Sequence, residues 1–409
     1  MTFTEEQYVK ALDELFDKHP SVQKDGFTSG AYKPGLAGME AFDAALGHPW
    51  MRFRSIHVAG TNGKGSVSSM LASALSAQGY SVGLYTSPHL LDFRERMKIV
   101  CDGSFRMPSR EFVWDFLHEQ DLDGLSFFEI TTGMAFRWFA DEGVDIAVIE
   151  VGLGGRLDST NIITPELSIV TSIGLDHCAM LGNTRAEIAG EKAGIFKPGV
   201  PALVATRDDE TECVFEDKAA ECHCPLFFAE DFECEAFPLD LKGPCQTINL
   251  RTVMAALELL GEEADEEAIA QTASATGFHG RWEKLLDNPE TICDIGHNPA
   301  ALELNFRRLE ELGRPLFIVY GIMADKDLAG IRPLMPQNAR YYLVAPKTAR
   351  ALPAEKLSEA MDGLEFTIEP SVADGVRAAI EAASQLPDAL VYIGGSTFVV
   401  SEAAASLAL

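Results

Sequence analysis

The sequence has little positive charge for its length. Its 409 residues include 33 Lys and Arg against 62 Asp and Glu, which gives a net charge of −29 at pH 7. A surface of that sign repels phosphate backbones and anionic lipid, so neither nucleic acid nor a membrane is expected as a partner. Small anionic substrates stay possible, because glycine amides, a lysine or a metal can reverse the field inside one cleft.

Cysteine is also sparse, and the composition is not that of a disordered, collagenous or membrane protein. Eight cysteines are too few for a disulfide scaffold in a chain this long, and no basic and then apolar leader precedes the first helical pattern. We therefore expect a cytoplasmic protein. The run Cys222-His223-Cys224 could suggest zinc, but its spacing is not that of a zinc knuckle and no second ligand pair follows.

What the sequence does contain is a regular alternation of short β-branched runs and longer helical patterns. A capping box at Thr4-Glu5-Glu6-Gln7 predicts an amphipathic helix at the start. The alternation that follows predicts an α/β fold with a mainly parallel sheet covered on both faces. The expected strands of this first series are 55–59, 81–85, 146–151 and 167–172, with helices from 66 and around 129–140.

A second and smaller α/β series begins after Glu283. Its expected strands are 292–295, 315–320, 340–345, 364–368 and 389–393, with helices at 300–312 and 372–386. We therefore predict two α/β domains, 1–283 and the smaller 284–409. The region 281–291 carries turn residues but no long linker, which predicts a short hinge and two domains face to face.

The strand at 55–59 runs directly into Gly60-Thr61-Asn62-Gly63-Lys64-Gly65-Ser66 and then into a helical pattern. Glycines let the backbone wrap a phosphate, Lys64 supplies charge, and the helix N-terminus adds free amides. The loop lacks the full spacer of the G-x-x-x-x-G-K-[ST] pattern. We interpret it as a compact nucleotide phosphate loop rather than a glycine-rich turn without a ligand.

Two further segments place polar residues at the same predicted sheet edge. Glu150 ends a buried strand, where acids that hold magnesium are found in phosphate-loop enzymes, and His177 follows the next strand together with Asp176. An isolated histidine is more often an ordinary loop residue, but this position favours a metal ligand. The run 152–155 is a weak dinucleotide signal, and by pattern alone Lys192 would be a surface lysine.

Taken in order, the motifs resemble the Mur-ligase-like amide ligases, and within them folylpolyglutamate synthase and its bifunctional relative that is also dihydrofolate synthase. They span nearly the whole chain. His279, where the family usually has proline, is the one departure noticed, and the segment 207–243 matches no motif. The resembling segments are 60–66, 86–90 with 95–96, 128–131, 150–161, 171–177, 191–199, 280–283, 294–299, 325–327 and 394–396.

The resemblance implies an ATP-dependent ligase. Its residues 1–283 would form the ATP-binding central domain with the phosphate loop, and residues 284–409 a C-terminal Rossmann-like ligase domain. The acceptor carboxylate would take the γ-phosphoryl group of ATP to become an acyl phosphate, which the amine of L-glutamate then attacks. The expected cofactors are ATP and two Mg²⁺ ions, and the expected substrates are dihydropteroate, folates and L-glutamate. The run 86–90 followed by Glu95-Arg96, in a chain without a leader, looks most like the bacterial bifunctional enzymes, so both acceptors are expected. A monomer is the form typical of the family.

The resemblance also implies a role for individual residues. It gives magnesium to Ser87, Glu150, His177 and a carbamylated Lys192, and the catalytic steps to Lys64, His177, Lys192 and His297. Nucleotide contacts fall on Thr61, Asn62, Gly63, Lys64, Gly65, Ser66, Asn249, Arg281 and Asp294. Substrate contacts fall on Phe128, Glu129, Leu157, Asp158 and Ser159.

Plainer interpretations stay open for some of these residues. Asn249 could be only a helix N-cap, Asp294 and His297 could be turn residues, and Arg281 could pair with a surface acid. For the whole protein, the alternatives are a monofunctional folylpolyglutamate synthase, a cell-wall Mur-type ligase, a phosphate-loop NTPase or kinase, and a dinucleotide-binding module. The NTPase or kinase would leave the second domain and the predicted ligands Ser87, His177 and Lys192 without a role. The dinucleotide-binding module is supported only by the run 152–155.

Overall fold

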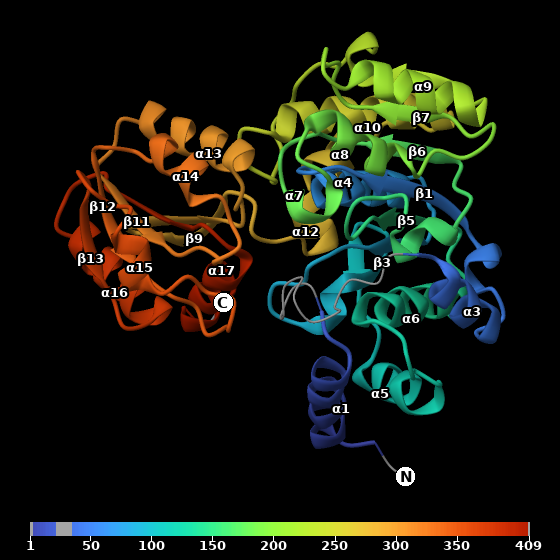
Figure 1. Cartoon of the computed structure of the whole chain (residues 1–409), viewed down its shortest axis with the longest axis horizontal. Coiled ribbons are helices and arrows are strands. Elements are labelled where there is room, and N and C mark those ends of the chain that lie inside the picture. The colour runs from blue at the N-terminus through green and yellow to red at the C-terminus, as the bar shows by residue number, and fades with distance from the viewer. Residues whose placement is uncertain (1–2, 22–34, 408–409) are drawn as a thin grey trace. The chain divides into compact units, whose positions relative to one another are not determined.

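The computed structural model of the chain describes residues 3–21 and 35–407 (Figure 1). The chain divides into two compact units. Unit 1 comprises Met1–Asp240 and Gln246–Phe278, and unit 2 comprises Leu241–Cys245 and His279–Leu409. Each unit is an α/β structure with one mainly parallel sheet, which confirms the predicted fold class. The domain boundary after Glu283 and the packing of the two domains stay predictions.

Unit 1 is built on an eight-stranded sheet in the order β4-β3-β2-β5-β1-β6-β7-β8. All neighbours from β2 to β8 pair in parallel, whereas β3 and β4 add an antiparallel edge. The strands are β1 (Arg54–Ala59), β2 (Val82–Tyr85), β3 (Met97–Cys101), β4 (Ser104–Arg106), β5 (Ile146–Glu150), β6 (Leu167–Val170), β7 (Ala202–Val204) and β8 (Leu226–Phe228).

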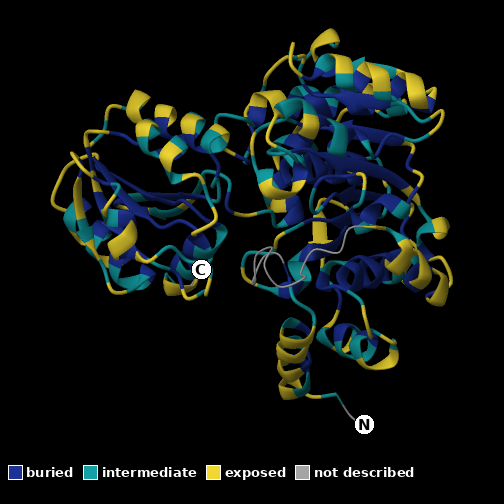
Figure 2. Cartoon of the chain, viewed as in Figure 1, coloured by how far each residue is buried: buried dark blue, intermediate teal, exposed yellow. Residues whose placement is uncertain are grey.

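Helices cover this sheet, and strands β1, β2, β5 and β6 are buried almost throughout because both faces are packed (Figure 2). The capping box at Thr4 is present as predicted at the start of the first helix. The helices of unit 1 are α1 (Glu5–Lys18), α3 (Ala37–Ala45), α4 (Lys64–Ala77), α5 (Arg110–Glu119), α6 (Phe127–Glu142), α7 (Cys178–Leu181), α8 (Arg185–Ala193), α9 (Glu212–Cys222), α10 (Gln246–Leu260), α11 (Glu266–Ala270) and α12 (Thr272–Thr276).

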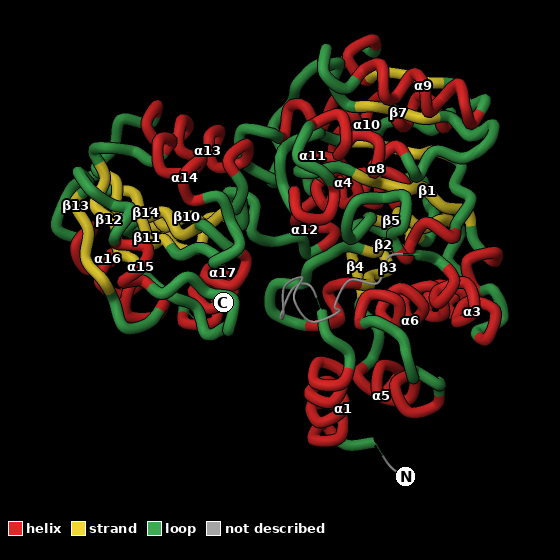
Figure 3. The backbone as a smooth tube through the Cα atoms, in the orientation of Figure 1, coloured by secondary structure: helices red, strands yellow, loops and turns green. Residues whose placement is uncertain are grey.

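Unit 2 is built on a six-stranded sheet in the order β13-β12-β11-β14-β10-β9, in which only β9 is antiparallel (Figure 3). Its strands are β9 (Glu283–Asp287), β10 (Glu290–Asp294), β11 (Leu316–Tyr320), β12 (Ala339–Leu343), β13 (Glu365–Ile368) and β14 (Leu390–Gly394). Its helices are α13 (Pro299–Glu311), α14 (Leu328–Ile331), α15 (Ala354–Ser358), α16 (Val372–Ala383) and α17 (Thr397–Ser406).

Short 3-10 helices complete the connections. They are η1 (Pro49–Arg52), η2 (Phe93–Arg96), η3 (Ser159–Ile162), η4 (Ala229–Asp231) and η5 (Arg332–Leu334). The segment 207–243, in which the sequence showed no motif, contributes α9 and β8 to unit 1. No described helix combines the length and the apolar composition that a membrane crossing needs.

Several strands escaped the sequence analysis. The antiparallel edge strands β3, β4 and β9 were not predicted, and β9 occupies the region that we had treated as a hinge. Strands β4 and β9 are short, largely exposed or half-buried, and without β-branched residues, so their side chains carry little pattern, whereas β3 is a short buried strand. The central strands of both sheets lie where they were predicted, within a few residues.

Candidate active site

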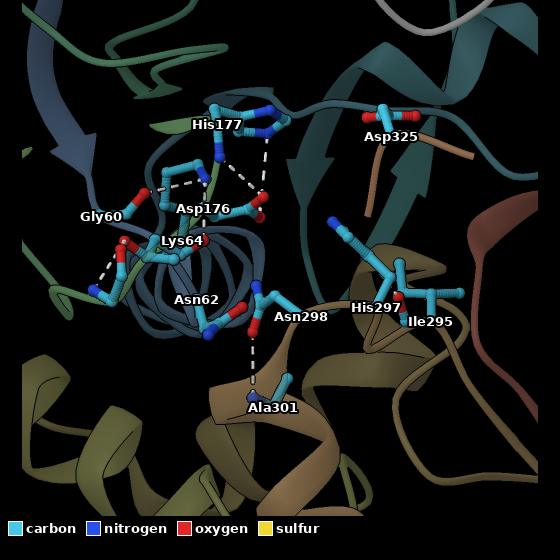
Figure 4. Close-up of polar contacts among 12 residues, drawn as sticks. Gly60, Asn62, Lys64, Asp176, His177, Ile295, His297, Asn298, Ala301 and Asp325 are labelled. Carbon is cyan, nitrogen blue, oxygen red and sulfur yellow. Dashed lines mark hydrogen bonds and ion pairs between the residues drawn. The ribbon is translucent and has the colours of Figure 1, made fainter. Parts of the chain in front are cut away.

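The phosphate loop begins where the central strand β1 ends and closes at the first residue of α4. Gly63 precedes the helix with a φ of 89°, a left-handed conformation that favours glycine. The Lys64 ammonium folds back over the loop, where Nζ donates to the carbonyl oxygens of Gly60 at 3.0 Å and Thr61 at 3.4 Å (Figure 4). The loop therefore presents the free amides of a helix N-terminus next to a lysine, as phosphate binding requires.

Hydroxyl groups at the end of β6 hold this loop in shape. The hydroxyl oxygen of Ser172 accepts a hydrogen bond from the backbone N–H of Asn62 at 2.9 Å, and its carbonyl oxygen accepts one from the Thr61 N–H at 2.8 Å. The Thr171 hydroxyl donates to the Asn62 carbonyl oxygen at 2.6 Å. The sequence analysis gave these two residues no role. The signal was their position after a strand that pairs with β1, which becomes visible only once the strand order is known.

Gly60 is the position in the loop that tolerates a side chain least. Its φ is 151°, and a Cβ there would lie 1.9 Å from the Thr171 hydroxyl oxygen and 3.2 Å from the Ser172 backbone nitrogen. We expect Gly60→Ala to lower the free energy of unfolding by about 1–3 kcal/mol more than Gly79→Ala does. Gly79 is a matched control, because its φ is 90° and nothing lies within 4 Å of its added Cβ. Urea unfolding measures both, and equal losses would contradict the close approach.

Glu150 ends β5 beside the phosphate loop, because β5 pairs with β1 in parallel and places Glu150 opposite Val58. The carboxylate is buried, its Oε2 accepts from the Ser87 backbone N–H at 3.0 Å, and its Oε1 lies 4.0 Å from Lys64 Nζ. Ser87 follows β2, the neighbour of β5. A carboxylate and a serine hydroxyl at one sheet edge are hard oxygen donors of the kind that magnesium prefers, so these residues fit the predicted metal.

Lys192 is buried near the end of α8, with 3% of its surface exposed, so the interpretation as a surface lysine is wrong. Its Nζ donates to the Gly60 carbonyl oxygen at 2.9 Å, the same oxygen that Lys64 contacts. Burial lowers the pKa of Lys192 to about 7, and the charge of Lys64 acts in the same direction. A single carbonyl therefore brings the phosphate-loop lysine and this second amine together.

His177 follows β6 on the other side of β1. It adopts a left-handed backbone conformation with a φ of 53°, which is uncommon for a residue with a side chain and favours a functional interpretation. Its backbone N–H donates to Asp176 Oδ1 at 2.9 Å, and its Nε2 lies 3.8 Å from Asp176 Oδ2 (Figure 4). The Asp176 carboxylate therefore lies beside this ring, a proximity that the sequence analysis did not assign.

Asn249 lies inside α10, which begins at Gln246, so it is not the N-cap of that helix. Its side chain is buried against the phosphate loop, since a Cβ on Gly63 would lie 2.5 Å from Asn249 Oδ1. Its Nδ2 donates to Gln246 Oε1 at 2.9 Å. The structure therefore brings Asn249 next to the loop, although α10 is far from it in sequence.

The residues predicted to contact the acceptor lie at the start of α6 and in the loop after β5. The ring of Phe128 lies near the ring of Tyr85, with 5.9 Å between centroids, and against the backbone of Gly152. Glu129 completes a capping box in which its Oε2 accepts from the Ser126 N–H at 2.7 Å. Asp158 is buried, while Leu157 and Ser159 on either side are partly exposed. Glu129 and Asp158 thus have structural partners inside unit 1, and their contact with substrate stays a prediction.

The remaining predicted residues belong to unit 2. Asp294 is buried and accepts from the N–H groups of Trp282 at 3.1 Å and Gly296 at 2.7 Å, so it holds the turn after β10. His297 lies in that turn with Nδ1 3.0 Å from the Ile295 carbonyl oxygen, and Asn298 caps α13 through the Ala301 N–H (Figure 4). Arg281 is partly buried. The turn interpretation fits the contacts of Asp294 and His297, and their nucleotide and catalytic roles stay predictions.

Across the described ranges, no group of three His, Cys, Asp or Glu side chains is gathered as a metal site. The predicted magnesium set differs in kind, because it adds a serine hydroxyl and a modified lysine to Glu150 and His177. In unit 1 the strands β2, β5, β1 and β6 bring Ser87, Glu150, Lys64 and His177 to one sheet edge, and α8 adds Lys192 there. Convergence of this kind at the carboxyl ends of parallel strands is typical of ligand sites in α/β proteins.

Comparison with known families gives two matches along the chain. Residues 58–236 match the Mur ligase middle domain, and residues 280–397 match the Mur ligase glutamate ligase domain. Folylpolyglutamate synthase of Lacticaseibacillus casei is 33% identical over 395 residues, which cover 87% of this chain and 90% of that protein. The resemblance inferred from the motifs is therefore confirmed.

Solved structures match over the same length. The E. coli FolC in complex with DHPP and ADP superposes with a TM-score of 0.83 at 30% sequence identity, covering 97% of this chain and 96% of that one. A bifunctional folylpolyglutamate synthase/dihydrofolate synthase with Mn, AMPPNP and L-glutamate bound gives a TM-score of 0.80 at 30% identity, covering 92% and 95%.

Proposed function

Because this chain belongs to the Mur ligase family of ATP-dependent ligases and, within it, to the folylpolyglutamate synthases, we propose that it joins L-glutamate to both dihydropteroate and reduced folates. The observation that carries the proposal is the convergence on Gly60. The phosphate-loop lysine and the buried Lys192 both donate to its carbonyl oxygen, and Glu150 lies 4.0 Å from Lys64 Nζ. Names of relatives with both activities, including that of Bacillus subtilis, support the two acceptors.

The proposed reaction has to bring negatively charged groups close together. ATP and the acceptor carboxylate are both anionic, so they approach one another only where cations and amides face them. The free amides at the start of α4 and the Lys64 ammonium bind the phosphates and draw charge from the γ-phosphoryl group. An acceptor carboxylate oxygen attacks the γ-phosphorus, the bond to ADP breaks, and the resulting acyl phosphate has phosphate as its leaving group. The glutamate amine then displaces that phosphate and forms the amide.

In this proposal, bound magnesium would shield the negative charge of the phosphates and polarise the γ-phosphoryl oxygens. Ser87 and Glu150 would hold one ion, and Glu150, His177 and Lys192 the other. A relative has been solved with Mn and AMPPNP, which supports a divalent metal here. Two ions and the assignment of each ligand are part of the proposal.

Lys192 can serve as a metal ligand only after a change in its chemistry. An ammonium group repels a cation, whereas addition of CO₂ to the neutral amine gives a carbamate with two oxygen donors. Burial and the neighbouring Lys64 lower the pKa of Lys192 to about 7, which makes the neutral amine available near neutral pH. The carbamate would then face the Lys64 ammonium, so that attraction replaces the repulsion between two cations.

The test of this function is magnesium-dependent incorporation of labelled L-glutamate with ATP. Parallel reactions contain 7,8-dihydropteroate, tetrahydrofolate or no acceptor. We expect an amide product with both acceptors and none without. Product with tetrahydrofolate alone would instead identify a monofunctional folylpolyglutamate synthase, and ATP consumption without any amide would identify an NTPase or kinase. A cytoplasmic monomer acting on small molecules completes the proposal, and gel filtration measures the oligomeric state.

A further inference from the structure

A buried histidine on the central strand β1, His57, has no role in the chemistry above. His57 is the fourth residue of β1, fully buried, and pairs across the sheet with Ile149 of β5. Ile149 in turn pairs with Tyr85 of β2, whose hydroxyl contacts Thr131 and Thr132 of α6. Paired residues of parallel strands point to the same face, so His57 lies on the face that α6 covers.

The imidazole is the first member of a buried hydrogen-bonded series. His57 Nε2 lies 2.8 Å from the Thr160 hydroxyl oxygen, and that hydroxyl lies 2.5 Å from Asp158 Oδ1. Burial lowers the pKa of His57 to about 3, so the ring is neutral and carries one proton. The Thr160 hydroxyl has a single proton and donates it to the carboxylate. The Thr160 oxygen must then accept a hydrogen bond from Nε2 of His57, so the single ring proton lies on Nε2.

The surroundings of the other ring nitrogen, Nδ1, support the Nε2–H tautomer. Nδ1 of His57 is buried without a hydrogen-bond partner among the described residues. A proton on Nδ1 would leave a buried donor unpaired and would also deprive Thr160 of a donor. The Nε2–H form leaves only an acceptor unpaired and keeps every proton of the series in use.

Asp158, at the far end of the series, organises the loop between β5 and η3. Its Oδ2 accepts from the Leu153 N–H at 2.9 Å, and its Oδ1 accepts from the Thr160 N–H at 3.0 Å. One carboxylate thus closes the loop that carries Leu157 and Ser159, two predicted acceptor contacts. The loop is therefore tied to strand β1 through Thr160 and His57.

We propose that His57 is a positioning residue for acceptor binding, which acts through Thr160 on Asp158 and fixes the 152–159 loop to the strand that leads into the phosphate loop. This inference rests on the proposed function. His57 lies three residues before Gly60, so one rigid strand sets the position of both the acceptor loop and the ATP loop. The γ-phosphoryl transfer needs the two substrates aligned closely, and such alignment is worth large factors in rate.

The test compares two variants of His57. His57→Phe keeps a ring but removes the donor, and we expect it to raise the KM for 7,8-dihydropteroate about tenfold while the KM for ATP stays the same. His57→Gln places an amide N–H near the position of Nε2 and should restore most of the acceptor affinity. A KM for dihydropteroate that stays normal in His57→Phe, or equal increases in both KM values, would overturn the proposal.

Thr160→Val removes the same link from its other side and serves if His57→Phe fails to fold. The double variant should raise the KM for dihydropteroate no further than either single variant, because both break one series, and additive effects would overturn the proposal. ¹⁵N NMR of histidine-labelled protein reads the tautomer without any substrate. If the protein forms amide but His57 carries its proton on Nδ1, the result contradicts the hydrogen-bonded series from His57 to Asp158 and leaves the proposed function standing. The Nε2–H tautomer in a protein that forms no amide contradicts the proposed function, and with it the role in acceptor binding.

Discussion

Replacing Lys64 with alanine is expected to lower the rate of amide formation by about 10³-fold or more, the loss typical when a cation at a transferring phosphoryl group is removed. Lys64 Nζ contacts two carbonyl oxygens of the phosphate loop and lies 4.0 Å from Glu150 Oε1. Without it, the negative charges of the γ-phosphoryl group, the acceptor and Glu150 face one another with one cation fewer. Steady-state assay of labelled glutamate incorporation measures the loss.

Lys218→Ala is the matched control for this variant. Lys218 is a partly buried lysine on α9 of the same unit, with its Nζ 2.8 Å from Glu221 Oε1. Its removal should leave the rate unchanged and cost little stability, because an ion pair of this kind contributes little. Undiminished turnover in Lys64→Ala would refute the phosphate-loop role of this residue.

Lys192→Ala is expected to lower turnover by more than about 100-fold, since even the outer-shell partners of metal ligands cost 10–100-fold when they are removed. The fold should stay intact, because alanine removes a buried amine that costs desolvation in its charged form. Turnover at saturating ATP, together with circular dichroism of the same sample, separates the two effects.

The control for Lys192 comes from the same segment. Lys197 is partly buried, and like Lys192 it donates from Nζ to a backbone carbonyl oxygen, that of Asn161 at 2.7 Å. Lys197→Ala makes the same chemical change without removing a predicted metal ligand, and it should retain most of the activity. An unchanged rate in Lys192→Ala would contradict the carbamate assignment.

Local sequence patterns were sufficient to predict the phosphate loop and the central strands. Lys64 follows a buried apolar strand and precedes a helix, and every part of that motif is adjacent in sequence. Glu150 and His177 were predicted from the same logic, because Glu150 ends one strand, His177 follows the next, and parallel strands end at one edge. The strand order β2-β5-β1-β6 then brings these residues together as expected.

Residues whose environment is set by distant parts of the chain could not be predicted in this way. Lys192 has the pattern of a surface lysine near a helix end, and only the packing of α8 beside Gly60 buries it. Thr171, Ser172 and Asp176 act through contacts with segments about a hundred residues away or through local backbone geometry. The sequence around His57 indicates no function, because a histidine in an apolar strand can make a buried hydrogen bond to many different partners.

Transfer of the γ-phosphoryl group to an acceptor carboxylate before the amide forms is the central step of the proposed function. The most direct measurement uses 7,8-dihydropteroate with ¹⁸O in its carboxylate, ATP, magnesium and L-glutamate, and follows the isotope by mass spectrometry. We expect amide formation to transfer one carboxylate ¹⁸O to each inorganic phosphate released, because the phosphate leaves with the oxygen that attacked it. Amide formed together with unlabelled phosphate would contradict the acyl phosphate route, and phosphate released without amide would contradict the ligase function.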